Sequence, residues 1–336
     1  MTHKLDRAKQ VLERVASVRL LVVGDMVVDE HIVGATTRLS REAPVPVIEQ
    51  TGHLFVPGGA ANPAYNARAL GAEVSVCGLV GDDEMGARLR QILDGAGIHT
   101  AFLATEPNRA TPVKLRIWAG GDRQRQHQQV ARVDIVNREP VSESSQGELM
   151  LYLEGAVPEY DGIVISDYEN GVVAGPVLDF LLPLARARSK FIMADSHGRL
   201  RRFRGVSAMT PNQPEAEAEL GKSLDDESGL IAGGEELRTE LDCDNLLITL
   251  GSLGIALFSR GEEASVIPAH KVTGVADTTG AGDTVAATFA LSILAGATPR
   301  EAAELANAAG AAVVMKLGAA TTTASEIVAI LEEHVE

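Results

Sequence analysis

One string of residues is well suited to chemistry, and it reads Asp277-Thr278-Thr279-Gly280-Ala281-Gly282-Asp283-Thr284 before an apolar segment at 285–294. Glycines before a helix let backbone N–H groups turn toward an anion, and the helix dipole adds partial positive charge there. An Asp in the first helical turn can reach a hydroxyl beside that anion and accept its proton. The string predicts a phosphoryl-transfer site with Asp283 as catalytic base. Its anion hole would be formed by the backbone of Gly280, Ala281 and Gly282.

A simpler interpretation of the same string is structural. Gly280 and Gly282 would only make the turn into the helix, and Asp283 would be favoured in the first turn by the helix dipole. A bare Gly-x-Gly-Asp would favour that interpretation, but the full string is more specific. A second phosphate-binding signal, Gly221-Lys222-Ser223, fails as a P-loop because position 216 is Ala rather than Gly.

The elements that must position these residues follow an alternating pattern. Short apolar runs, typical of strands covered on both faces, occur at 18–23, 74–80, 162–165, 191–194, 206–209 and 246–250. Segments with helical periodicity lie between most of them. The pattern predicts a doubly wound α/β fold with a mostly parallel sheet, in which ligands bind beyond the carboxyl ends of the strands.

Two stretches, residues 31–50 and 112–134, break this alternation. The first alternates without helical period and carries Pro44 and Pro46, and the second reads as two extended runs joined at Gly120-Gly121-Asp122. Together they predict a small β-sheet lid, which would suit a flap over a site. We expect residues 1–336 to form a single domain with this lid.

Composition excludes several classes of function. The chain has 336 residues and a formal charge of −16, so nucleic acid and anionic membranes are poor partners. Two cysteines, Cys77 and Cys243, are too few for a disulfide framework and predict reduced thiols in a cytoplasmic protein. Residues 1–14 lack the uninterrupted apolar stretch of a signal peptide. The eight histidines show no metal-ligand spacing.

A second string, Pro57-Gly58-Gly59-Ala60-Ala61-Asn62-Pro63-Ala64, precedes the Asp283 string. With these two strings in this order, the chain resembles the ribokinase-like (PfkB) family of sugar kinases over nearly its whole length. The resemblance implies a Rossmann-like main domain, a β lid, and ATP with Mg²⁺ as cofactors, with room for a monovalent cation. It also implies that Asp29, Gly58, Gly59 and Asn62 bind sugar hydroxyls, because missing side chains let the backbone approach a ring closely.

The resemblance assigns a nucleotide end as well. Glu215, in an Asn-x-x-Glu element with Asn212, would orient Mg²⁺ through water, which suits a hard cation that keeps its waters. The residues implied to bind the nucleotide are Asn212, Glu215, Thr249, Gly251, Gly254, Asp277 and Asn307.

A narrower resemblance concerns the substrate end. Residues 38–47 are similar to the lid of the bacterial heptose 7-phosphate kinases, and the strings containing Lys114, Arg132 and Asp167 fit the same branch as substrate-binding residues. The chain departs from that branch at Glu169-Asn170-Gly171 and at Asp195-Ser196-His197-Gly198, where the branch has Ala-Lys-Gly and Asp-Pro-Lys-Gly. Two cations expected near a phosphorylated substrate are thus absent.

Three functions stay open from the sequence. The first is a kinase for a hydroxyl of a sugar or sugar phosphate, with heptose 7-phosphate as one substrate. The second is a nucleoside kinase of the same fold, which the few aromatic residues disfavour, and the third is an inactive ligand-binding regulator, which should lack the base or the glycines. Lids of the family often pair between subunits, so we expect a homodimer through the lid.

Overall fold

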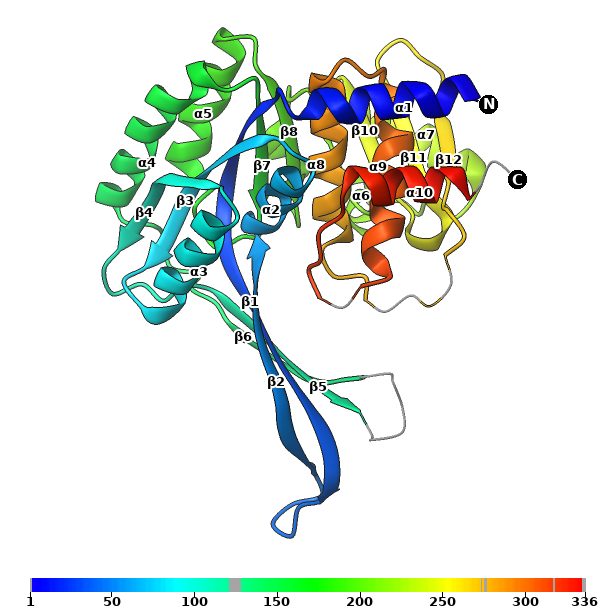
Figure 1. Ribbon diagram of the computed structural model, residues 1–336. Coiled ribbons are helices and arrows are strands. Elements are labelled where there is room, and N and C mark those ends of the chain that lie inside the picture. The colour runs from blue at the N-terminus through cyan, green and yellow to red at the C-terminus, as the bar shows by residue number, and fades with distance from the viewer. Residues whose placement is uncertain (1, 121–127, 273, 275–276, 317, 334–336) are drawn as a thin grey trace.

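The computed structural model describes residues 2–120, 128–272, 274, 277–316 and 318–333. A central sheet lies between two layers of helices, and a narrow lid projects from one end of this body (Figure 1). No helix among the described residues is long and apolar enough to cross a membrane.

The sheet is parallel over most of its width. Neighbouring strands from β4 to β10 run parallel, whereas β11 and β12 add an antiparallel edge that the apolar runs did not predict. In spatial order the strands are β4 (His99–Glu106), β3 (Glu73–Gly81), β1 (Arg19–Leu39), β7 (Gly162–Asp167), β8 (Phe191–Ser196), β9 (Ala208–Met209), β10 (Asn245–Thr249), β11 (Gly254–Ser259) and β12 (Ser265–Pro268). The predicted doubly wound, mostly parallel architecture is confirmed.

The two faces of the sheet carry separate hydrophobic cores. Along β1, Leu20 and Val22 pack into one core and Leu21 and Val23 into the other, which explains the continuous apolar run. The first core is covered by α1 (Thr2–Val15), α2 (Ala61–Ala69), α3 (Glu84–Gly95), α8 (Ala281–Leu294), α9 (Pro299–Val314) and α10 (Ala324–Glu332). The second is covered by α4 (Glu143–Ala156), α5 (Gly175–Ala187), α6 (Gln213–Leu220) and α7 (Glu227–Leu241).

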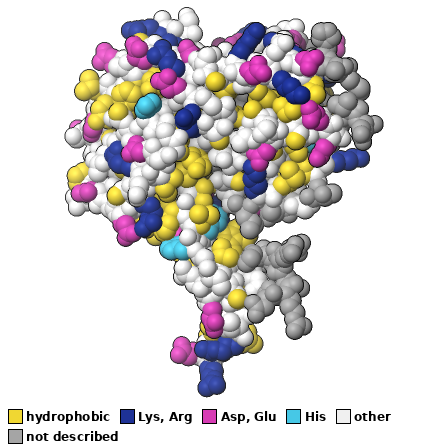
Figure 2. Space-filling view, viewed as in Figure 1, with side chains coloured by type: hydrophobic (Ala, Val, Ile, Leu, Met, Phe, Trp, Pro, Cys, Tyr) yellow, Lys and Arg dark blue, Asp and Glu magenta, His cyan; other side chains and the backbone are white. Residues whose placement is uncertain are grey.

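The lid grows directly out of the central strand. β1 continues past the sheet and pairs antiparallel with β2 (Pro46–Gly59), from Met26 opposite Gly59 to Leu39 opposite Pro46. β5 (Val113–Gly120) pairs with β1, and β6 (Gln128–Ile135) pairs with β5. The hairpin reaches well beyond the body, and charged side chains gather at its tip (Figures 1 and 2). The pairing is longer than residues 31–50, and most of the expected turn at 120–122 lies outside the described residues.

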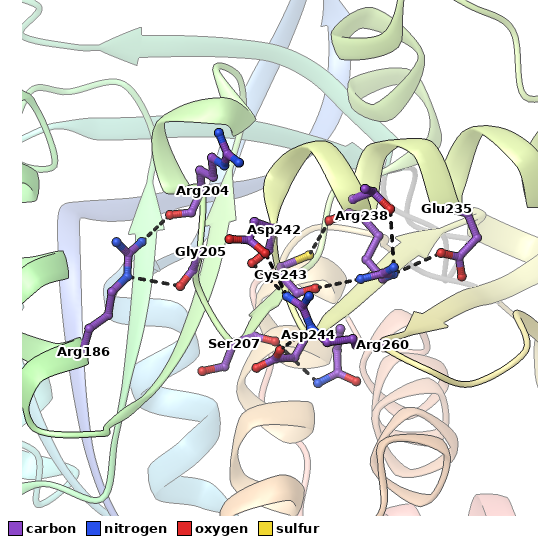
Figure 3. A network of polar contacts seen from close by, with 12 residues as sticks. Arg186, Arg204, Gly205, Ser207, Glu235, Arg238, Asp242, Cys243, Asp244 and Arg260 are labelled. Carbon is purple, nitrogen blue, oxygen red and sulfur yellow. Dashed lines mark hydrogen bonds and ion pairs between the residues drawn. The ribbon is translucent and has the colours of Figure 1, made fainter.

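A polar cluster fixes the opposite ends of the strands, where the chain enters β9 and β10 (Figure 3). Arg260 pairs with Asp242 and Asp244 at 3.0 Å each, and Arg238 donates to the carbonyl of Cys243 at 3.2 Å. Exposed pairs of this kind contribute little stability individually. Because the cluster lies at the amino ends of parallel strands, it belongs to the scaffold rather than to a ligand site.

Candidate active site

Asp283 lies buried in the first turn of α8, with its carboxylate held by two neighbours. Asn62, in α2, donates from Nδ2 to Oδ2 at 2.8 Å. The hydroxyl of Tyr168, just after β7, donates at 3.0 Å to Oδ2 and lies 3.2 Å from Oδ1. The predicted base therefore sits where α2, α8 and the carboxyl end of β7 meet.

The electrostatic surroundings of Asp283 suit a base. Burial raises the pKa of Asp283 to about 6, while the hydrogen bonds from Asn62 and Tyr168 and the nearby cations His197 and Lys114 lower it. A carboxylate with a pKa just below neutrality is ionised at neutral pH yet holds a proton better than an exposed Asp does. The site can thus accept a proton from a bound hydroxyl.

The loop before α8 has the shape expected of an anion hole. Gly280 has φ 77°, a left-handed conformation that favours glycine, and a Cβ there would collide with Nδ2 of Asn62. The N–H groups in the first turn of a helix have no hydrogen-bond partner within that helix. The N–H of Ala281 points back to the carbonyl of Thr278 at 3.3 Å, so Gly282 and Asp283 carry the amides better placed to receive an anion.

Asp277 shapes this loop. Its carboxylate accepts from the N–H and hydroxyl of Thr279, at 2.9 and 2.7 Å, and from the N–H of Gly318 at 3.0 Å. These contacts hold the loop against the chain that follows α9. Asp277, predicted to bind the nucleotide, thus supports the loop that carries the predicted anion hole.

The predicted sugar-binding residues meet at the base of the lid. Asp29 pairs with Arg116 at 2.7 Å, and both side chains are about 5% exposed. A Cβ on Gly58 would come within 2.8 Å of the Asp29 carboxylate, so only glycine leaves the present space. One carboxylate oxygen of Asp29, Oδ1, thus accepts a hydrogen bond from Arg116. The string containing Lys114 pointed to Arg116, but nothing in the sequence marked it as buried.

The two predicted lid cations differ in their surroundings. Arg132 forms two hydrogen bonds with the exposed Asp134, at 2.7 and 2.6 Å, and is largely neutralised by it. Lys114 lies with Nζ 4.3 Å above the ring of Tyr168, and burial lowers the pKa of Lys114 while Asp29 raises it. Of these two, Lys114 has more charge available for a ligand.

Asp167, at the end of β7, is hydrogen-bonded to its own loop and to β8. Its carboxylate is buried and accepts from the N–H of Glu169 at 3.0 Å and from the hydroxyl of Ser196 at 3.1 Å. The next residue, Tyr168, makes the contact with the base. Both stood in the same string, and alternation along a strand end could not decide which of them faced the cleft.

Asp25, which sequence reasoning did not select, holds the loop that carries Tyr168. Its carboxylate accepts from the N–H groups of Tyr168, Asn170 and Val172, at 2.9, 3.0 and 3.0 Å. Burial raises the pKa of Asp25 to about 6 against these donors, which lower it. Its position at the end of a buried apolar run was the only signal for it in the sequence.

A cavity of about 490 Å³ borders the start of α8. Six predicted residues line it: Thr249, Gly251, Gly254, Ala281, Gly282 and Asn307. Asn307 donates from Nδ2 to the carbonyl of Pro268 at 2.8 Å, which ties α9 to β12. Apolar atoms of Ile255, Val272 and Val285 also line the cavity, whose size suits a cofactor.

Asn212 and Glu215 form the start of α6. Each accepts from the other's backbone N–H at 2.9 Å, in a capping box, and Oε1 of Glu215 lies 3.0 Å from Nδ1 of His197. Among the described residues no group of three His, Cys, Asp or Glu side chains forms a metal cage. Mg²⁺ in such sites uses one or two carboxylates with water and phosphate. Partial burial and the neighbouring Asp283 raise the pKa of Asp195 to about 7, and Glu215 also interacts with this carboxyl. A bound cation would favour the ionised form of Asp195, so the residues fit a cation that arrives with a nucleotide.

The family model for pfkB family carbohydrate kinases matches residues 18–326. The chain therefore belongs to the pfkB family of carbohydrate kinases, and the predicted family is confirmed.

Individual relatives narrow the comparison. The chain is similar to two proteins named "Bifunctional protein HldE". One, from Trichlorobacter lovleyi, is 36% identical over 97% of this chain and 65% of the relative. The other, from Wolinella succinogenes, is 38% identical over 92% of this chain and 63% of the relative. The chain thus spans about two thirds of the length of these curated relatives.

Solved structures support the fold. Ribokinase of Arabidopsis thaliana, complexed with ribose and ATP, matches with a TM-score of 0.71 at 20% identity, over 94% of this chain and 99% of that one. Phosphofructokinase-2 of Escherichia coli, with substrates and products, matches with a TM-score of 0.76 at 20% identity, over 95% and 100%. The ribokinase-like fold is confirmed.

Proposed function

We propose that this protein transfers the terminal phosphoryl group of ATP to a hydroxyl of a sugar or sugar phosphate. The observation that carries the proposal is the placement of Asp283: a buried carboxylate in the first turn of α8, beside the 490 Å³ cavity that Ala281 and Gly282 line. The base and the anion-binding amides thus share one helix end, where an alcohol and a phosphate can meet in line.

The roles of the residues follow from this placement. The acceptor sugar binds against Asp29 and Gly58, and ATP occupies the cavity between α8, α9 and β11. Asp283 accepts the proton of the attacking hydroxyl as the new O–P bond forms and the bond from phosphorus to ADP breaks. The amides of Gly282 and Asp283 hold the transferring group. Mg²⁺, held through water by Glu215, would neutralise charge on the phosphates, and a monovalent cation remains a further proposed cofactor.

A sugar phosphate of the heptose 7-phosphate class is the acceptor we favour. The lid string at 38–47 and the relatives named HldE support this choice. Lys114 supplies positive charge near Asp29 and Tyr168, and His197 stands where the heptose branch has a lysine. Hydrogen bonds to such charges contribute roughly 1.5–3 kcal/mol each.

An acceptor panel tests the function directly. We expect ADP release from ATP with heptose 7-phosphate, and less with unphosphorylated hexoses or nucleosides. ADP release with a nucleoside alone would favour a nucleoside kinase of the same fold. ATP binding without turnover on any acceptor would contradict the proposed activity and favour a regulator.

We also propose that the lid pairs with the lid of a second copy. Several large apolar side chains on or beside the lid strands are exposed, and they are Leu39, Val45, Leu54, Val130, Val133 and Ile135. A second lid packed against these strands would remove apolar side chains from water. The chain mass is 35.4 kDa, so light scattering should give about twice that value, and a mass equal to one chain would contradict the pairing.

We further propose a cytoplasmic location, because free cysteines are typical of a reducing compartment. Cys77 and Cys243 are both free and buried, and burial raises the pKa of each thiol to about 12. Such thiols are structural and unreactive.

A further inference from the structure

Tyr168 lies at the meeting point of the groups around the base. Its hydroxyl contacts both oxygens of Asp283, at 3.0 and 3.2 Å. One face of its ring supports Nζ of Lys114, 4.3 Å from the ring centroid. His197 packs edge-on against the ring, with centroids 4.4 Å apart and planes at 76°. The side chain therefore contacts the base, a lid cation and the residue that follows β8 at once.

The loop that carries Tyr168 is held in one conformation from two sides. Asp25 accepts three backbone N–H groups of the loop, and Arg109 donates from Nη2 to the carbonyl of Asn170 at 2.6 Å. Glu169, next to Tyr168, has φ 57°, a conformation that L residues rarely adopt. Backbone strain persists only where surrounding contacts over-determine it, and it concentrates at functional sites.

The contact with Asp283 has a defined direction. Burial and the nearby Asp283 raise the pKa of Tyr168 well above its ordinary value, so the phenol keeps its proton and donates. A donor to a carboxylate favours the ionised form of that carboxylate. Oδ2 of Asp283 accepts hydrogen bonds from both Asn62 and Tyr168 at 3.0 Å or less, whereas the one contact of Oδ1 with the described residues is that with Tyr168 at 3.2 Å. Oδ1 is therefore the oxygen better placed to take the acceptor's proton.

We propose that Tyr168 is a positioning residue for the base: its hydroxyl keeps the Asp283 carboxylate ionised and directs Oδ1 toward the acceptor hydroxyl. This inference rests on the proposed kinase function. The charged and polar groups that face Asp283 are Asn62 from α2, Tyr168 after β7, Lys114 from β5, and Asp195 and His197 at the end of β8.

Tyr168→Phe tests the role, because it removes the hydroxyl and keeps the ring under Lys114 and beside His197. The base acts when ionised, so kcat/KM of the wild type should rise with pH through about 6, the pKa of Asp283. Without the donor this acid limb should move upward by about one pH unit, with about tenfold lower activity at pH 5.5 and a smaller loss at pH 8.5. An acid limb that stays in place would overturn the proposal.

Tyr160→Phe is the matched control. Tyr160 precedes β7 at the other end of the strand, is buried, and bonds through its hydroxyl to Ser75. The Tyr160→Phe variant should lose about as much stability as Tyr168→Phe, and its kcat/KM should keep the acid limb of the wild type. An equal shift of the limb in both variants would reduce Tyr168 to a structural role.

A readout without turnover separates this inference from the proposed function. The ¹³C resonance of the Asp283 carboxyl, assigned by its loss in Asp283→Asn, should titrate at higher pH in Tyr168→Phe than in the wild type. If no acceptor is phosphorylated but this titration still moves, the proposed function fails and the contact stands. If turnover is normal and neither titration nor limb moves, the inference alone fails.

Discussion

Replacing Asp283 by Asn should abolish most turnover while leaving the protein folded. The amide has nearly the same shape but cannot accept a proton, and loss of a positioned base typically lowers the rate by about 10²–10⁴-fold. ATP affinity should change little, since the cavity at this helix end is bordered by Ala281 and Gly282 rather than by the carboxylate. Single-turnover assays with the best acceptor of the panel, beside calorimetric titration with ATP, measure both effects.

The same variant should be at least as stable as the wild type at neutral pH. The folded-state pKa of Asp283, about 6, lies above its ordinary value. The free energy of unfolding therefore falls as pH rises from about 4 through 6, because ionised Asp283 is less favourable in the folded protein. The neutral amide in Asp283→Asn does not undergo this loss. Asp94→Asn, at the exposed end of α3, is the matched control and should alter neither turnover nor ATP binding. Near-normal turnover in Asp283→Asn would contradict the assignment of the base.

Replacing Arg116 by Ala should have the largest effect on stability in the lid. The Arg116–Asp29 pair is buried, with N and O atoms 2.7 Å apart. Removing one partner leaves an uncompensated buried charge, which typically costs about 3–5 kcal/mol. The lid strands should open more often, and KM for the acceptor should rise because Asp29 no longer presents a fixed carboxylate. Hydrogen exchange of the β1, β2 and β5 amides, with acceptor kinetics, measures this.

Arg132→Ala provides the comparison. Arg132 lies opposite Arg116 in the β5–β6 register, but its partner Asp134 is exposed to solvent. Water and salt screen such a pair, so its loss should cost only about 0–1 kcal/mol. Equal protection of the lid amides in Arg116→Ala and wild type would show that the buried pair does not hold the lid.

The sequence predicted the parts of the fold that depend on periodicity. Runs such as 18–23 are apolar on both faces, and only a sheet covered on both sides buries them. The antiparallel edge of β11 and β12 escaped prediction because β12 is four residues long and half exposed. The full length of the lid was not predicted either, because the pairing of β1 with β2 already begins at Met26, within the buried apolar part of the strand.

The candidate site was predictable where backbone geometry requires a particular residue type. Gly280 and Gly58 stand where a Cβ would strike Asn62 or Asp29, and both lie in strings that the sequence singled out. Tyr168 and Asp25 were missed because their roles depend on which strand ends meet in space. The sequence alone shows neither that the Tyr168 hydroxyl contacts Asp283 in α8 nor that the Asp25 carboxylate accepts from three backbone N–H groups.

A crystal structure with a non-hydrolysable ATP analogue and the acceptor sugar would test the central claim most directly. We predict the terminal phosphate against the amides of Gly282 and Asp283, and an acceptor oxygen about 3 Å from Asp283 Oδ1. A sugar bound with every hydroxyl out of reach of that carboxylate, or a nucleotide whose phosphates point away from α8, would contradict the proposed mechanism.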